Sequence, residues 1–190
     1  MNTVIEPCCY SKQLTYNLEQ AESGGGVSHF FSFSDWGTDE LIPWVLSSVT
    51  GCDAVVCLVQ LDFRTIDVIS QMMSRMYHDR KEGIEKYVVN HLTLVVRPSR
   101  TDADRQRQEL VAQLGRYIGE GRVTVCEDNI GFRCITAGNG KRHIVIQGSL
   151  NQNHVEPCCQ MFTMTVSKQA YDMAMGMLLS KKRTRKIKLL

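Results

Sequence analysis

The segment Arg142-His143-Ile144-Val145-Ile146-Gln147-Gly148-Ser149-Leu150-Asn151 is the most informative stretch of the chain. An apolar run leads into Gly-Ser-Leu-Asn, the pattern of a buried strand that ends in a polar turn. Gly138-Asn139-Gly140-Lys141 separates this run from a second apolar run over residues 132–137. Because Asn and Gly tolerate positive φ, the two runs are expected to form a β-hairpin.

Apolar patterning extends the sheet outward from this hairpin. Short or nearly continuous apolar runs predict further strands over residues 29–33, 54–61, 91–96, 122–127 and 160–166. Apolar residues at helical spacing predict helices over residues 38–48, 66–77, 102–119 and 169–179. Strands that alternate with helices indicate an α/β fold, here a mixed β-sheet flanked by helices on both faces.

The chain length of 190 residues suits one domain with short extensions. Ser23-Gly24-Gly25-Gly26 is typical of a hinge, so residues 1–26 are interpreted as a flexible lead-in. The domain is then expected over residues 27–180, followed by a basic tail over residues 181–190.

The composition is that of a globular protein. Hydrophobic residues make up 43% and charged residues 22%, which argues against wholesale disorder. No apolar run approaches the ~18 residues of a membrane helix, and the first ten residues lack the pattern of a secretory signal. We therefore expect a cytoplasmic protein without membrane insertion. Its cysteines are expected to be reduced, and Cys52, Cys57, Cys126 and Cys134 fall in or beside apolar runs as small core residues.

The hairpin, the turn Gly148-Ser149-Leu150-Asn151, the strand after it and the last helix together resemble the second half of phospholipase D-like (HKD) domains. The resemblance is to the compact nuclease-like members found in bacteria and phages. In those domains a strand with His-x-Lys precedes the hairpin, Gly-Ser-x-Asn follows it, and the next strand opens with Glu. The lead Ser34-Asp35-Trp36-Gly37 and the elements after it are similar to the family's opening β-α-β-α units. The resemblance covers residues 27–180 and implies a phospholipase D-like fold.

The chain departs from the family at the catalytic positions. The resemblance places the family's histidine near Gly131, its lysine near Arg133 and its glutamate near Gln160. In the family one histidine attacks phosphorus and a second, from the paired motif, acts as the general acid. Gly131 has no side chain and cannot form the covalent intermediate.

The remaining motif residues imply phosphate binding without hydrolysis. Arg133 could hold a phosphate through its planar guanidinium, while Gly148, Ser149 and Asn151 complete the anion-holding part of the motif. The expectation is a catalytically impaired domain that binds phosphodiester backbones, with nucleic acid as the first candidate. The resemblance also implies a homodimer, because a chain with one motif copy needs a second for a two-fold site. No cofactor is expected.

Two alternatives stay open. His143 on the hairpin or His154 just after the motif could supply a displaced imidazole and make the chain an active phosphodiesterase or nuclease, although both are more typical of surface positions. Cys134 adjoins Arg133, but strand alternation sends the two to opposite faces and favours a core role for the thiol. The other alternative is a structural or partner-binding module without a site.

Cationic residues concentrate at the C-terminus. Six positive charges fall in eight residues and form a strip that could neutralise phosphates: Lys181, Lys182, Arg183, Arg185, Lys186 and Lys188. A second group, at Arg97, Arg100, Arg105 and Arg107, is interspersed with acidic residues and is interpreted as a solvated charged face. The adjacent pairs Cys8-Cys9 and Cys158-Cys159 suit zinc poorly, so no metal site is predicted.

Overall fold

The computed structural model describes residues 9–32, 38–58, 61, 63–83, 89–118, 122–128, 133–148, 160–180 and 185–186. Its strands are β1 (Val27–Ser32), β2 (Cys52–Leu58), β3 (Val89–Val96), β4 (Val123–Glu127), β5 (Cys134–Gly138), β6 (His143–Gly148), β7 (Gln160–Val166) and β8 (Arg185–Lys186). Its helices are α1 (Cys9–Ser23), α2 (Thr38–Ser48), α3 (Phe63–Lys81), α4 (Asp102–Ile118) and α5 (Lys168–Leu178).

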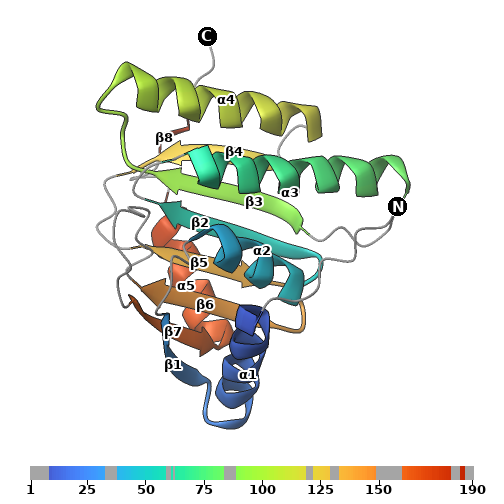
Figure 1. Ribbon diagram of the computed structural model, residues 1–190, viewed down its shortest axis with the longest axis vertical. Helices are drawn as coiled ribbons and strands as arrows, with labels where there is room; N and C mark the ends of the chain where they lie inside the picture. The colour runs from blue at the N-terminus through green and yellow to red at the C-terminus, as the bar shows by residue number, and fades with distance from the viewer. Residues whose placement is uncertain are drawn as a thin grey trace.

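All eight strands form one mixed sheet in the order β1-β7-β6-β5-β2-β3-β4-β8 (Figure 1). Strands β2, β3 and β4 are parallel, and every other neighbouring pair is antiparallel. Strand β6 therefore runs in the same direction as β2, β3 and β4. The carboxyl ends of these four strands meet at one edge, called the carboxyl edge below, where β5 and β7 begin.

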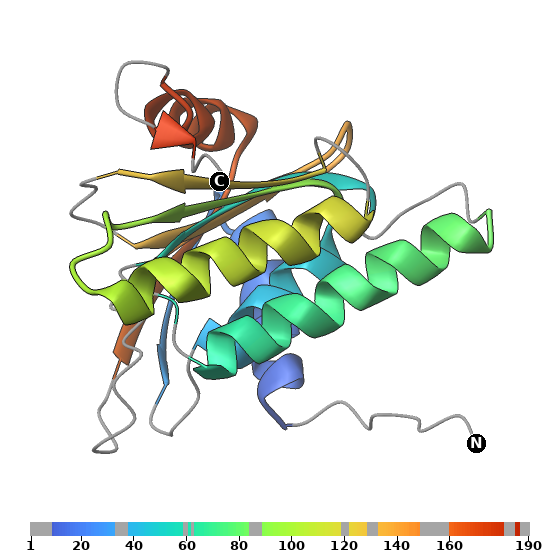
Figure 2. The same cartoon turned by 90° about the horizontal axis from the view of Figure 1, so that it is seen from above.

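Helices cover both faces of the sheet, as the sequence predicts. Helices α1 to α4 lie on one face and α5 lies on the other (Figure 2). The larger core lies under the first four helices and includes Leu41, Ile69, Leu94 and Phe162. A smaller cluster under α5 contains Val55, Cys57, Val95, Cys134 and Leu178.

The predicted hairpin is confirmed, and it lies beside the predicted strand 160–166. Strand β5 pairs with β6, and β6 pairs with β7, both antiparallel. In the turn, Asn139 Oδ1 accepts hydrogen bonds from the backbone N–H groups of Lys141 and Arg142, both at 2.8 Å. The Asn side chain thus stabilises the turn directly, which is its usual role in this position.

Residues 9–23 correct the expectation of a flexible lead-in. They form α1, whose residues Leu14, Leu18 and Ala21 are buried at helical spacing against the sheet. Glu22 Oε1 lies 2.8 Å from Arg142 Nε and ties this helix to the hairpin. The glycine run is the turn into β1 rather than a hinge, because Gly26 N–H donates to the Ala21 carbonyl at 2.7 Å.

The basic tail is partly inside the fold. Arg185 and Lys186 form β8, in which Arg185 pairs with Glu127 and Lys186 with Cys126. The domain boundary expected at residue 180 therefore does not mark the end of the sheet. The other basic residues of the tail lie outside the described residues. Among the described helices, none is long and apolar enough to cross a membrane.

Candidate anion-binding site

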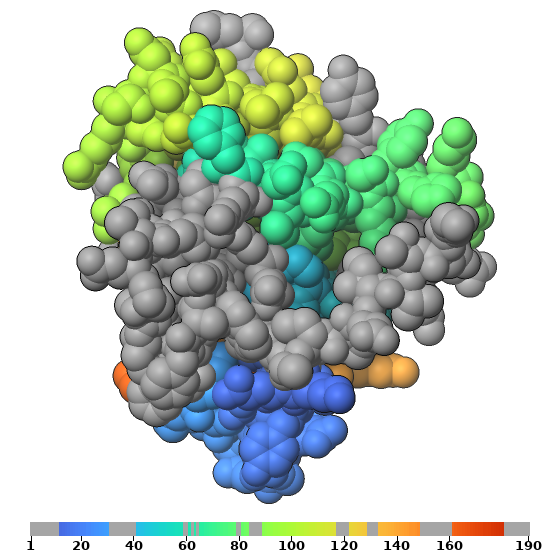
Figure 3. Space-filling view, in the orientation of Figure 1, coloured from blue at the N-terminus to red at the C-terminus, as the bar shows by residue number. Residues whose placement is uncertain are grey.

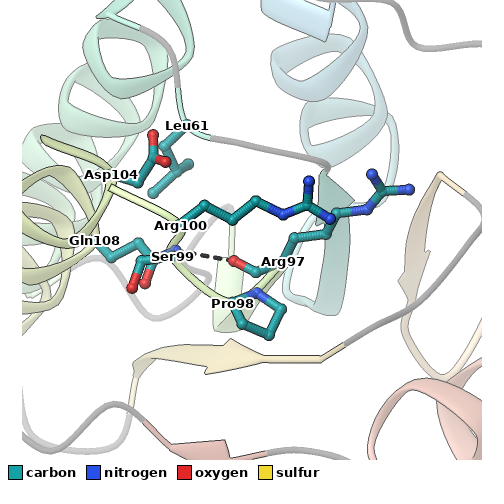
Figure 4. A pocket seen from close by; sticks show the side chains of 7 residues that line it. All are labelled: Leu61, Arg97, Pro98, Ser99, Arg100, Asp104 and Gln108. Atoms are coloured by element: carbon teal, nitrogen blue, oxygen red, sulfur yellow. Dashed lines mark hydrogen bonds between the residues drawn. The ribbon is translucent and has the colours of Figure 1, made fainter. Parts of the chain in front are cut away.

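A pocket of about 180 Å³ lies at the carboxyl edge, between the end of β3 and the first turns of α4 (Figure 4). Ligand sites in α/β sheets commonly lie outside the carboxyl ends of the strands. The residues that line this pocket are Leu61, Arg97, Pro98, Ser99, Arg100, Asp104 and Gln108.

The connection from β3 to α4 is held by two polar contacts. Gln108 is only 4% exposed and donates from Nε2 to the Arg97 carbonyl at 3.1 Å. The Ser99 N–H donates to Glu127 Oε1 of the neighbouring strand at 3.2 Å. Contacts within the protein thus hold the segment at Arg97 and at Ser99.

The charge balance of the pocket favours an anion. Its one carboxylate, on Asp104, pairs with Arg107 Nη1 at 3.2 Å. Within the described part of the chain, neither Arg97 nor Arg100 makes an ion pair. Both guanidinium groups extend to the same side of the pocket, away from Asp104 and Gln108 (Figure 4).

Arg133 adds a third guanidinium at this edge. It immediately precedes β5, and β2 alone separates β5 from β3, so the backbones of Arg133 and Arg97 are about 10 Å apart. Burial of the guanidinium, and then the positive charge of Arg97, lower the pKa of Arg133. We call Arg97, Arg100 and Arg133 the arginine site. Two like charges held this close favour a bound anion between them.

Two carboxylates near the arginine site reduce its positive charge. Glu127 accepts the loop hydrogen bond, and Asp128 lies close enough for its charge to raise the pKa of Cys57. Asp128 Oδ2 is buried and has no hydrogen-bond partner among the described residues. Among the described residues, these two carboxylates lie near the arginine site, and Arg97 and Arg100 are still not paired with either of them.

The predicted motif residues reach this edge where the structure describes them. Gly148 ends β6 there, and Gln147 before it pairs with Cys134, the residue after Arg133. The glycine also has a packing reason, because a Cβ at this position would meet the Phe162 ring and would lie 2.8 Å from the Met161 carbonyl oxygen. Ser149, Asn151 and Gly131 lie outside the described residues.

His143 lies at the other end of the sheet. It begins β6, five residues from Gly148, so about 17 Å of strand separates it from the arginine site. Its ring packs edge-on against Tyr171 of α5, with ring centroids 5.0 Å apart. His143 is therefore not placed to act on a ligand of the arginine site. His154 lies outside the described residues.

The buried thiols are poor nucleophiles. Burial raises the pKa of Cys134 to about 11 and the pKa of Cys57 to about 12, so both stay protonated near neutral pH. The interpretation of Cys134 as a core residue is confirmed. Across the described ranges, no group of three or more His, Cys, Asp or Glu side chains is placed to hold a metal ion. Cys8 and the pair Cys158-Cys159 lie outside those ranges.

The interpretation as a solvated charged face is confirmed for Arg105 and Arg107 and is wrong for Arg97 and Arg100. Arg105 pairs with Asp102 and Arg107 with Asp104, each within one turn of α4. Arg97 and Arg100 instead line the pocket. The acidic residues near Arg97 and Arg100 in the sequence thus form ion pairs with other arginines. The sequence alone does not reveal this pairing.

Comparison with known proteins gives distant similarity to solved structures. No protein-family model and no curated protein matches the chain. Among solved structures, the chain is similar to TrmBL2, an archaeal chromatin protein whose structure is described as showing a novel mode of DNA binding. The TM-score is 0.47 at 10% sequence identity, over 92% of this chain and 61% of that one. The chain thus spans less than two thirds of that structure, and a likeness of this size does not bear on function.

Proposed function

We propose that this chain binds the phosphodiester backbone of nucleic acids at the arginine site and does not hydrolyse it. The observation that carries the proposal is that Arg97 and Arg100 line a pocket at the carboxyl edge, while Arg133, from a separate segment, lies close enough for the charge of Arg97 to lower its pKa. Guanidinium groups bind phosphate oxygens through paired, charge-assisted hydrogen bonds, so they suit this ligand better than lysines would.

The resemblance to phospholipase D-like domains supports the same ligand. The resemblance puts the family's phosphate-holding lysine near Arg133, and Gly148, which the resemblance assigns to the Gly-Ser-x-Asn motif, ends β6 at the same edge. The same resemblance puts the family's nucleophilic histidine near Gly131, which has no reactive side chain. The thiols near this edge are protonated, so they offer no substitute. Binding without turnover is the consequence.

Charge-neutralising variants test the site. In fluorescence anisotropy with a labelled oligonucleotide, Arg97→Gln and Arg133→Gln should each weaken binding at least roughly tenfold, because a hydrogen bond to a charged group contributes about 1.5–3 kcal/mol. Arg105→Gln is the matched control, since Arg105 pairs with Asp102 on the outer face of α4. Equal affinities for the wild type and both site variants, with unchanged melting temperatures, would exclude the arginine site.

A hydrolysis assay distinguishes binding without turnover from the alternative of an active phosphodiesterase. The purified chain should not turn over a bis-aryl phosphate. Turnover that is abolished in His154→Ala, but kept in His143→Ala, would instead favour an active phosphodiesterase with a displaced histidine. His143 is the control because it lies at the opposite edge of the sheet.

The resemblance further implies a two-fold homodimer that brings two arginine sites together. Closed two-fold pairs are also the commonest assembly of soluble proteins. Light scattering at tens of micromolar protein should give twice the chain mass of 21.5 kDa. A monomer mass with intact nucleic-acid binding would keep the site and remove the dimer. A protein that binds no nucleic acid would favour a purely structural module.

A further inference from the structure

An exposed aromatic side chain follows closely on a residue of the pocket that Arg97 and Arg100 line. Phe63, the first residue of α3, is 76% exposed, the largest exposed fraction among the large hydrophobic residues in the described ranges. Leu61, two residues earlier, lines the pocket. Figure 3 shows the first turn of α3 at the molecular surface, next to α4. The ring is therefore open to solvent and belongs to the segment that follows the pocket residue Leu61.

The ring is held in place from one side. The guanidinium carbon of Arg107 lies 4.9 Å from the Phe63 ring centroid, which is a cation–π contact. Arg107 is itself fixed by Asp104, a pocket residue, at 3.2 Å. A chain of contacts thus runs from the pocket through Asp104 and Arg107 to the exposed ring.

A single exposed aromatic residue needs no explanation by itself, because apolar atoms make up much of any protein surface. Phe63 differs in its setting. It combines an exposed ring, an orientation held by Arg107, and a place two residues after Leu61 of the pocket that Arg97 and Arg100 also line. Proteins that bind single strands combine these same features, a cationic groove for the backbone and an aromatic face on which bases stack. The bases of a duplex are already stacked and do not offer a free face.

We propose that Phe63 is a base-stacking platform that makes the arginine site selective for single-stranded nucleic acid. This inference rests on the proposed phosphodiester binding and adds the class of ligand. A phosphate occupies the arginine site while a neighbouring unpaired base stacks on the ring. Stacking on the ring does not distinguish one base from another, because every base has a π face. The site therefore selects single strands over duplexes and does not select a particular sequence.

Three probes and four variants test the platform. The probes are a labelled single strand of about 12 nucleotides, its duplex, and the same strand without bases. Phe63→Ala and Phe63→Leu should weaken binding of the intact single strand roughly 5- to 150-fold, and should leave the duplex and the abasic strand unchanged. Phe63→Trp should retain single-strand affinity, and its added tryptophan emission should be quenched by the bound strand. Tyr77→Ala is the control, because Tyr77 is 50% exposed near the other end of the same helix.

The outcomes distinguish this inference from the function on which it rests. Unchanged single-strand affinity in Phe63→Ala, or equal wild-type affinity for the single strand and the duplex, overturns the platform. If Arg97→Gln and Arg133→Gln still weaken binding in that case, phosphodiester binding stands without it. Failure of the wild type to bind any of the three probes overturns both. Because Phe63 is exposed, its substitution should not change the melting temperature, which confirms that each variant is folded.

Discussion

At the scale of single residues, packing alone can explain why position 148 of the motif is a glycine. Its missing Cβ leaves room for the Phe162 ring and for the Met161 carbonyl oxygen, 2.8 Å from where the Cβ would stand. We expect Gly148→Ala to lower the free energy of unfolding by roughly 1–3 kcal/mol, the usual cost of overpacking. Gly176→Ala is the control, since nothing lies within 4 Å of its Cβ position and helices favour alanine. Urea denaturation measures both, and an unchanged midpoint for Gly148→Ala would remove the packing explanation.

The buried thiols predict how stability depends on pH. Burial raises the pKa of Cys52 and of Cys57 to about 12, and of Cys134 to about 11. A raised folded-state pKa means that the folded chain keeps protons that the unfolded chain releases. The resulting stability is fully present below the unfolded pKa of about 9 and is lost as the pH rises through the folded value.

A cysteine variant isolates this effect from other groups that titrate in base. Between about pH 9 and 11, each such thiol should steepen the loss of unfolding free energy by about 1.4 kcal/mol per pH unit. Cys57→Ala should therefore be less stable than the wild type at neutral pH, because a buried group is removed, yet should lose stability more slowly over that alkaline range. Parallel stability curves for the two proteins, from urea melts at each pH, would contradict the buried-thiol account.

The candidate site is only partly predictable from these residues. Arg133 and Gly148 can be found because a short motif marks their position. Arg97 and Arg100 cannot, because the acidic residues near them in sequence suggest local neutralisation. Those acidic residues form ion pairs with other arginines along α4. The pairs depend on the spacing of residues along the helix, which composition does not show. Phe63 gives no signal either, because the apolar helical pattern begins only at residue 66, after the turn that carries the ring.

At the scale of elements, local patterns predict the strands and helices well and their order across the sheet poorly. The hairpin and strand 160–166 are neighbours because short connections pair them. The pairing of β1 with β7 joins residues more than a hundred positions apart, and no local pattern specifies it. Helix α1 is hard to recognise because its apolar stripe is narrow and the glycine run after it resembles a linker.

Helix α1 should contribute to stability although it precedes the glycine run. Leu14 is fully buried against the sheet, so Leu14→Ala should lower the unfolding free energy by about 2–5 kcal/mol, the sum of reduced burial and the cavity left behind. Tyr16→Ala on the same helix should cost far less, because Tyr16 is 59% exposed. Equal urea midpoints for the two variants would restore the view of this segment as a dispensable lead-in.

At the scale of the whole molecule, the tail brings positive charge to the sheet edge that holds the arginine site. Strand β8 begins at the carboxyl edge, because Arg185 pairs with Glu127, the last residue of β4. The chain carries a net charge of only +2, and the tail holds six of its 22 basic residues. Long-range attraction of a polyanion should therefore come largely from this end of the chain.

The last prediction is that tail charges set the salt dependence of nucleic-acid binding, while the arginine site sets what remains at high salt. Deleting residues 181–190 would also remove β8 and uncover the edge of β4, so a charge variant is the cleaner test. Changing Lys181, Lys182, Arg183 and Lys188 to Gln keeps β8, and should flatten the log–log salt slope by up to about 0.7 for each phosphate of a single strand that is no longer neutralised.

A matched variant with Lys12, Lys81, Lys141 and Arg116 changed to Gln alters net charge equally at exposed positions elsewhere. In anisotropy titrations from roughly 50 to 300 mM salt, a range over which such slopes are measurable, the slope should flatten for the first variant and not for the second. Equal slopes in both variants would mean that net charge alone attracts the nucleic acid and that the tail makes no phosphate contacts of its own.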